Sequence, residues 1–264
     1  MRFTKMQGLG NDYLYVYGEV PENAAELSAK LSDRRFGAGS DGMIFITRSG
    51  VADFGMRIFN ADGSEAEMCG NGIRCVGKYL FDKGLTDRTR LTVETLAGVR
   101  TIELDVVSGK VQSVTVDMGK VEVSADIRLT VGDSRISGTP VSVGNPHFVI
   151  FTEDIGKAPL MSLGPLIEKH RAFPGGVNTE FVGVTGKGRL RMRVWERGSG
   201  VTSACGTGAC AAAAAAVARG FCLSDSDIFV DLDGGTLCVS VSSDGRVTMK
   251  GPAEFVYEGE TCQC

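Results

Sequence analysis

The chain has 264 residues, a formal net charge of −4 and 43% hydrophobic residues, enough for one large or two modest globular domains. Its lysines and arginines are scattered, so the sequence lacks the basic patch that is typical of a nucleic-acid-binding protein. No apolar run approaches the ~20 residues of a membrane span, and residues 1–18 lack the apolar core of a signal peptide. We therefore expect a cytoplasmic protein with neither a nucleic-acid nor a membrane partner.

The first half of the chain alternates between strand and helix patterns. In chain order these predict an amphipathic helix, a strand, a second helix closed by glycine, and three short strands, at residues 23–33, 54–60, 69–84, 90–96, 99–106 and 111–119.

The second half gives the same series of patterns. It predicts a helix, a strand, a second helix and three short strands, at residues 157–170, 190–196, 205–220, 227–235, 236–243 and 246–252. The alanines at 211–216 give the second of these helices no polar face, so we expect it to be buried and enclosed by strands.

The two halves are copies of one unit. An offset of 136 residues places Met192 on Met56 and Cys205 on Cys69 without a gap. We therefore predict an α+β fold of two pseudo-symmetric domains, each a β-rich, barrel-like unit wrapped around a central helix.

The domain boundary is expected near residue 118. The predicted N-terminal domain is 1–118 and the C-terminal domain is 119–264, and the last strand, near 252–264, is a candidate to rejoin the N-terminal domain.

Cys69 and Cys205 stand directly before Gly-x-Gly at the predicted starts of equivalent helices. Free backbone N–H groups and the helix dipole favour an anion there, so a thiolate forms more easily than the free pKa of ~8.5 implies. The glycines let a bound carboxylate approach the backbone. Across a cleft between the halves, one thiolate can remove an α-proton while the opposite thiol returns a proton to the other face, which inverts a stereocentre without metal or other cofactor.

The cysteines also have less specific interpretations. The chain has eight cysteines without a CxxC pair, so we expect mostly free thiols and no metal site. A disulfide between Cys69 and Cys205 fits the same proximity and is interpreted as an oxidised, inactive form. The terminal CQC at 262–264 is expected to be a frayed tail. Four cysteines fit packing roles: Cys75, Cys210, Cys222 and Cys238.

Five motifs, in this order, resemble one family over the whole chain. They are GLGNDY at 8–13, FNADGSEAEMCGNGIRC at 59–75, GNPH at 144–147, GVNTEFV at 176–182 and ERGSGVTSACGTGACA at 196–211. The sequence closely resembles the diaminopimelate epimerases, PLP-independent enzymes that interconvert LL- and meso-diaminopimelate. The resemblance implies the diaminopimelate epimerase-like fold, this small-molecule substrate, no cofactor, a place in lysine and peptidoglycan precursor synthesis, and a homodimer.

The resemblance also implies roles for individual residues. Cys69 and Cys205 match the acid and base pair, and His147 and Glu196 match groups that assist near the reacting amine. Arg197 is the natural partner of the distal carboxylate. The residues that match the substrate-binding groups are Asn11, Asn60, Gly70, Asn71, Asn145, Asn178, Glu196, Arg197, Gly206 and Thr207.

The halves differ where the repeat places functional residues. Asn11 corresponds to His147 and Asn60 to Glu196, as expected if only one end of a nearly symmetric substrate is inverted. Asn11 and Asn145, beside glycine or proline, are equally compatible with turn residues that cap their own backbone. Gly42 departs from the family pattern, because some members carry there a glutamine that contacts substrate.

Two other functions stay open at this point. The same cysteine pair could racemise another amino acid, such as histidine. The chain could also be a non-catalytic protein that binds an amino acid.

Overall fold

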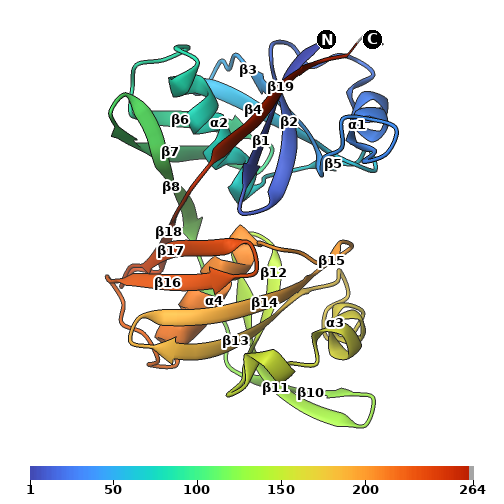
Figure 1. The fold of residues 1–264 in the computed structure, drawn as a ribbon. Coiled ribbons are helices and arrows are strands. Elements are labelled where there is room, and N and C mark those ends of the chain that lie inside the picture. Colours follow the sequence, from blue (N-terminus) through green and yellow to red (C-terminus); the bar gives the residue numbers. More distant parts are fainter. Residues whose placement is uncertain (262–264) are drawn as a thin grey trace. The chain divides into compact units, whose positions relative to one another are not determined.

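The computed structural model describes residues 1–261, and the chain divides into two compact units (Figure 1). One unit comprises Met1–Val116 and the chain from Gly251 onward, and the other comprises Asp117–Lys250. The predicted tail at 262–264 lies outside the described residues.

The first unit is a twisted arrangement of strands with two helices. Strand β2 pairs in parallel with β3, β3 antiparallel with β4, and β4 in parallel with β6, after which antiparallel pairs lead to β7 and β8. Its elements are β1 (Arg2–Gly8), β2 (Asn11–Tyr17), α1 (Ala24–Ser32), β3 (Gly42–Thr47), β4 (Phe54–Asn60), β5 (Glu65–Ala66), α2 (Gly70–Asp82), β6 (Arg90–Thr95), β7 (Gly98–Val107), β8 (Lys110–Lys120) and β19 (Glu254–Glu260).

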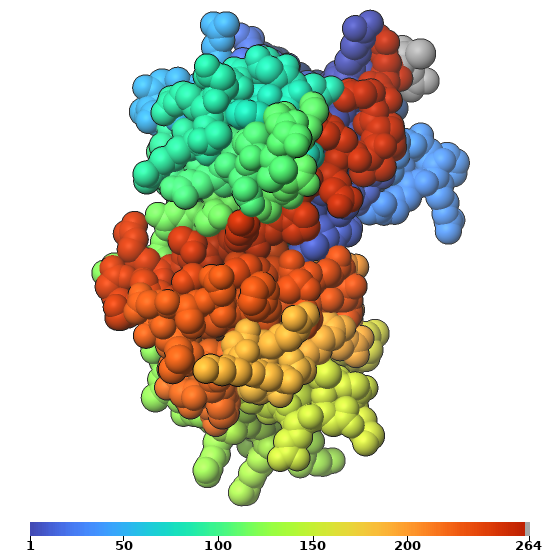
Figure 2. Space-filling model, turned by 60° about the vertical axis from the view of Figure 1, so that its left-hand side comes forward, coloured from blue at the N-terminus to red at the C-terminus, as the bar shows by residue number. Residues whose placement is uncertain are grey.

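The two ends of the described chain meet in this unit. Strand β19 pairs antiparallel with β1, and the Thr261 N–H donates to the Met1 carbonyl at 2.9 Å. The space-filling view accordingly has the last described residues, in red, beside the first, in dark blue (Figure 2).

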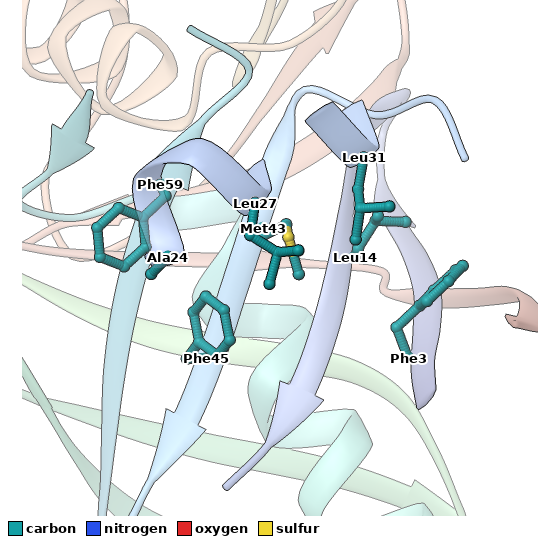
Figure 3. Packing of buried hydrophobic residues seen from close by; sticks show 8 residues of the cluster. All are labelled: Phe3, Leu14, Ala24, Leu27, Leu31, Met43, Phe45 and Phe59. Atoms are coloured by element: carbon teal, nitrogen blue, oxygen red, sulfur yellow. The ribbon is translucent and has the colours of Figure 1, made fainter. Parts of the chain in front are cut away.

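The two helices of the first unit use different faces of β2. Side chains alternate along a strand, so Leu14 faces α1 and packs with Leu27, Met43 and Phe45 in a buried cluster (Figure 3). Tyr15, the next residue, donates its hydroxyl to the Gly72 carbonyl of α2 at 3.3 Å. Burial of apolar side chains on the α1 face thus fixes which β2 side chains reach the start of α2.

The second unit repeats this topology. Strand β12 pairs in parallel with β13, β13 antiparallel with β14, and β14 in parallel with β16, before antiparallel pairs lead to β17 and β18. Its elements are β9 (Glu122–Val123), β10 (Ile127–Val131), β11 (Ser134–Ser142), β12 (Pro146–Phe151), η1 (Ile155–Lys157), α3 (Leu160–Glu168), β13 (Asn178–Gly186), β14 (Arg189–Glu196), β15 (Gly200–Val201), α4 (Gly206–Ala218), β16 (Asp227–Leu232), β17 (Gly235–Val241) and β18 (Arg246–Gly251).

The predicted helices and the predicted fold class are confirmed. Helices α2 and α4 begin one residue after their cysteines, and α4 contacts strands β11 to β14, β16 and β17. Ala211–Ala216 are each at most 2% exposed, because methyl groups leave room for strands to approach the helix closely on several sides. Within residues 1–261, the helices are too short or too polar to cross a membrane.

Candidate active site

Cys69 is the N-cap of α2. Its backbone is extended (φ −136°, ψ 117°), and the Gly72 N–H donates to its Sγ at 3.3 Å. Position 72 must stay free of a side chain, because a Cβ there would lie 2.6 Å from Cδ1 of Ile44 and 3.6 Å from the Cys69 Sγ. The half-buried thiol therefore stands at the positive end of the helix dipole, where an anion is stabilised.

Asn11 connects this cysteine to neighbouring elements. The Cys69 thiol donates to Oδ1 of Asn11 at 3.4 Å, and the amide of Asn71 donates to the same oxygen at 3.3 Å. The Asn11 amide in turn donates to Asp41 at 2.7 Å. Asn11, Cys69 and Asn71 form what we call the Cys69 cluster, and Asn11 uses its side chain for contacts across the unit.

Gly70 and Asn60, two further residues of this unit that the sequence predicts to bind substrate, lie in different surroundings. Gly70 opens α2 next to Cys69, with its backbone in the first helical turn. Asn60 lies at the end of β4, where its amide donates to Ser64 at 3.0 Å across the turn to β5. The structure thus gives Asn60 a local turn contact in addition to any role in binding.

Cys205 is the N-cap of α4 and repeats the arrangement in the second unit. Its Sγ accepts from the Gly208 N–H at 3.4 Å and lies 3.6 Å from Oγ1 of Thr207. Unlike Cys69, Cys205 is buried, at 4% exposure. Burial, followed by the negative charges of Glu196 and Glu180, raises the pKa of Cys205 well above that of an ordinary thiol. Cys205 is therefore a protonated thiol near neutral pH.

A chain of hydrogen bonds runs beside Cys205. Nδ1 of His147 lies 2.6 Å from Oε1 of Glu180, and both side chains are fully buried. Nε2 of His147 lies 3.0 Å from Oδ1 of Asn145, whose amide donates to Thr207 at 3.4 Å. The contacts of both ring nitrogens fix the orientation of the imidazole.

Glu196 lies on the other side of this cysteine. It accepts a hydrogen bond from the Thr202 hydroxyl and also has one with the Cys205 side chain. Burial raises the pKa of Glu196 above its usual value, since desolvation disfavours the carboxylate more than these hydrogen bonds favour it. The residues Asn145, His147, Glu180, Glu196, Cys205 and Thr207 are called the Cys205 cluster below.

Asn178 and Arg197 lie together at the ends of neighbouring strands. Oδ1 of Asn178 accepts from the backbone N–H of Arg197 at 2.7 Å. The exposed Arg197 side chain donates to the Gly175 carbonyl at 2.8 Å. Gly206, the last predicted residue, opens α4 directly after Cys205.

Glu180 and Thr202 were missed by sequence reasoning. Glu180 carries a recognisable signal, because it is a charged residue within the otherwise uncharged, buried start of β13. Thr202 carries none, because its contact with Glu196 depends on the turn between β14 and β15. Within residues 1–261, no group of acidic, histidine or cysteine side chains has the arrangement of a metal site, and the six described cysteines are free.

Solved structures with the same fold include epimerases and phenazine biosynthesis proteins. The chain superposes on a predicted epimerase from Pseudomonas aeruginosa with a TM-score of 0.76, at 17% identity, covering 100% of this chain and 99% of that one. It superposes on a hydroxyproline epimerase from Agrobacterium vitis, solved with bound trans-4-hydroxy-L-proline, with a TM-score of 0.71 at 19% identity, covering 98% and 91%. These likenesses show that the chain has this fold, in which a cysteine caps the equivalent helix of each unit.

Sequence relatives specify the family. The family described as diaminopimelate epimerase matches residues 3–124 and 139–256. A relative from Bacillus licheniformis with this name is 49% identical over 277 residues, which cover 98% of this chain and 97% of the relative. One from Methanococcus maripaludis is 48% identical, covering 98% and 99%. The chain belongs to the diaminopimelate epimerase family.

Proposed function

We propose that the chain interconverts LL- and meso-diaminopimelate without a cofactor, in the synthesis of lysine and of peptidoglycan precursors, and that Cys69 and Cys205 exchange the proton at the α-carbon. One observation carries the proposal. Equivalent cysteines in two copies of one fold each cap a glycine-opened helix, in a chain whose relatives at nearly half identity are named diaminopimelate epimerase.

The two thiols have unequal roles before turnover. The pKa of Cys205 lies well above the ordinary value because of burial and of the charges of Glu196 and Glu180, so Cys205 starts as the acid. Cys69 then starts as the thiolate base. It takes the α-proton onto Sγ, the electron pair stays on the α-carbon, and the Cys205 Sγ–H delivers its proton to the opposite face. The reverse reaction exchanges the two roles.

The helix starts stabilise the charge that develops. An α-proton is weakly acidic, so the site must favour the carbanion over the ground state. Backbone N–H groups at Gly70, Asn71, Gly206 and Thr207 are proposed to hold the reacting carboxylate, where the dipoles of α2 and α4 favour added negative charge.

The remaining groups orient the substrate. The exposed guanidinium of Arg197 suits the distal carboxylate as a bidentate partner, and Asn178 supports it through the Arg197 backbone. His147 and Glu196 are proposed to lie near the reacting amine, with Asn11, Asn60 and Asn145 as further polar contacts. We propose a homodimer in the cytoplasm as the working form.

Serine variants test this function. Purified chain is incubated with LL-diaminopimelate under reductant, and the stereoisomers are separated by chiral chromatography. We expect Cys69→Ser and Cys205→Ser each to lower the rate by at least about 100-fold, the range of one general acid or base, because serine is a far weaker acid than cysteine. Cys238→Ser, a half-buried thiol on β17, is the matched control and should keep full activity.

Each other result has a distinct meaning. Equal activity in both serine variants would exclude the two-thiol mechanism. A wild-type chain that is inactive on diaminopimelate but racemises another amino acid in a substrate panel, such as histidine, would retain the mechanism and change the substrate. Binding of diaminopimelate by calorimetry without any turnover would identify a binding protein.

A further inference from the structure

Alternate side chains of β2 point at the start of α2. Asn11 accepts from the Cys69 thiol at 3.4 Å, and Tyr15 donates to the Gly72 carbonyl at 3.3 Å. Tyr13 lies between them on the same face of the strand, because side chains two residues apart share a face. A third β2 side chain is therefore directed at the helix N-terminus that Cys69 caps.

The absence of a side chain at Gly42 leaves room for the Tyr13 ring. A Cβ at residue 42 would lie 3.0 Å from Cε1 of Tyr13 and only 2.2 Å from the Phe59 carbonyl oxygen. The tyrosine is 6% exposed, and its hydroxyl is within hydrogen-bonding reach of both Asn11 and Cys69. Some family members carry a glutamine at this position, and a glutamine here would require both Tyr13 and the Phe59 carbonyl to move. The departure from the family pattern at Gly42 therefore lies next to the Tyr13 ring.

We propose that Tyr13 is a positioning residue for the base, and that its hydroxyl accepts from the Asn11 amide and donates to the Cys69 sulfur once Cys69 is a thiolate. This inference rests on the proposed function of Cys69. A thiol donates to Oδ1 of Asn11, but a thiolate has no proton to donate and needs donors instead. The Gly72 N–H is one donor, and the phenol is the second.

The hydroxyl keeps its proton in both states. Burial, followed by the charge of Cys69, raises the pKa of Tyr13 well above the value of an ordinary phenol. The phenol therefore remains a donor at any pH at which Cys69 ionises.

The repeat shows why this donor distinguishes the two cysteines. The residue that corresponds to Tyr13 at the offset of 136 is Val149, which has no polar group. Cys205 has the carboxyl groups of Glu196 and Glu180 nearby, which oppose a thiolate. The phenol beside one cysteine and the acids beside the other both favour Cys69 as the base in the resting enzyme.

Tyr13→Phe removes the donor and keeps the ring against Gly42. The readout is the rate of iodoacetamide alkylation at Cys69 against pH, resolved by peptide mass spectrometry, with Cys205 as the internal reference. We expect the midpoint for Cys69 to rise by about one pH unit, so that alkylation at neutral pH falls about tenfold, as loss of one hydrogen bond to a charged group predicts. The kcat should fall by a similar factor at unchanged KM, since the phenol is proposed to act through Cys69.

Tyr17→Phe is the matched control. It makes the same change on the same strand at a ring that is 40% exposed, and it should leave the Cys69 midpoint unchanged. An unchanged midpoint in Tyr13→Phe would overturn the proposal. A shift of equal size at Cys205 would overturn it as well, because it would indicate a general disturbance of the fold.

A second replacement does not depend on how the phenylalanine variant folds. Fluorotyrosine at position 13 keeps ring and hydroxyl but is a stronger acid and hence a stronger donor, so the Cys69 midpoint should fall; a midpoint that stays or rises contradicts the proposal. Alkylation is measured without turnover. If this inference is wrong, the pH midpoint of Cys69 alkylation will not change as expected in the Tyr13 variants. If the proposed function is wrong, activity will survive Cys69→Ser.

Discussion

Glu180→Gln tests how the Cys205 cluster is held together. Both partners of the Glu180 and His147 pair are fully buried, with 2.6 Å between Oε1 and Nδ1. Glutamine has the same shape and keeps an oxygen facing Nδ1. It also places an amide NH₂ where Oε2 of Glu180, within residues 1–261, has no hydrogen-bond partner. The variant thus loses the charge of the pair and buries a donor without an acceptor.

These two losses set the expected magnitude. Converting a charge-assisted hydrogen bond to a neutral one costs about 1 kcal/mol, and a buried unsatisfied donor costs about 1–3 kcal/mol. We expect the free energy of unfolding in urea to fall by about 2–4 kcal/mol, the sum of the two losses. Glu153→Gln, at an exposed position of the same unit, should change it by less than about 0.5 kcal/mol.

The same variant should change the acidity of Cys205. The charge of Glu180 is one cause of the raised pKa of that thiol, after burial and Glu196, so its removal should lower the pH midpoint of Cys205 alkylation. A free energy of unfolding within about 0.5 kcal/mol of wild type, together with an unchanged midpoint, would refute the assigned role of Glu180.

Three further predictions concern packing and pH. Ala213→Leu, at a fully buried position of α4, should lower the free energy of unfolding by about 1–3 kcal/mol in urea, whereas Ala218→Leu at the exposed end should not. Gly42→Gln should cost at least about 2 kcal/mol in the same assay, because its Cβ meets the Phe59 carbonyl; wild-type stability would show that this backbone yields easily. The raised pKa of Cys205 means that the folded chain keeps this thiol protonated where the unfolded chain ionises it. Stability should therefore fall as pH rises above about 8.5, less steeply in Cys205→Ala, and equal slopes would contradict this.

The duplicated pattern made much of the fold predictable. Each helix and each strand after it could be read twice, and the helix starts at Cys69 and Cys205 were located to within one residue. The patterns did not identify the strands before residue 54 or those between 121 and 189. These segments pair in parallel or form short antiparallel pairs, and their position depends on partners distant in the sequence.

The candidate site was predictable only in part. Motifs pointed to Asn11 and His147, and the structure places Asn11 beside Cys69 and His147 in the hydrogen-bond chain beside Cys205. Glu180 and Tyr13 lie within the motifs at 176–182 and 8–13, but the contacts that distinguish them depend on strand register and on the space beside Gly42. Asn60 is the opposite case: the motif singled it out as a substrate-binding residue, whereas its described side-chain contact is local to a turn. A contact made by tertiary packing leaves little trace in local sequence.

Solvent deuterium incorporation at the α-carbon is the measurement that tests the central claim most directly. LL-diaminopimelate is incubated in D₂O with reductant, and the isotope content of substrate and product is followed separately. The two-thiol account predicts deuterium in newly formed meso product, and loss of product when Cys69 or Cys205 is replaced by serine. Meso product that retains the original hydrogen, or deuterated meso product formed at the wild-type rate by both serine variants, would contradict it.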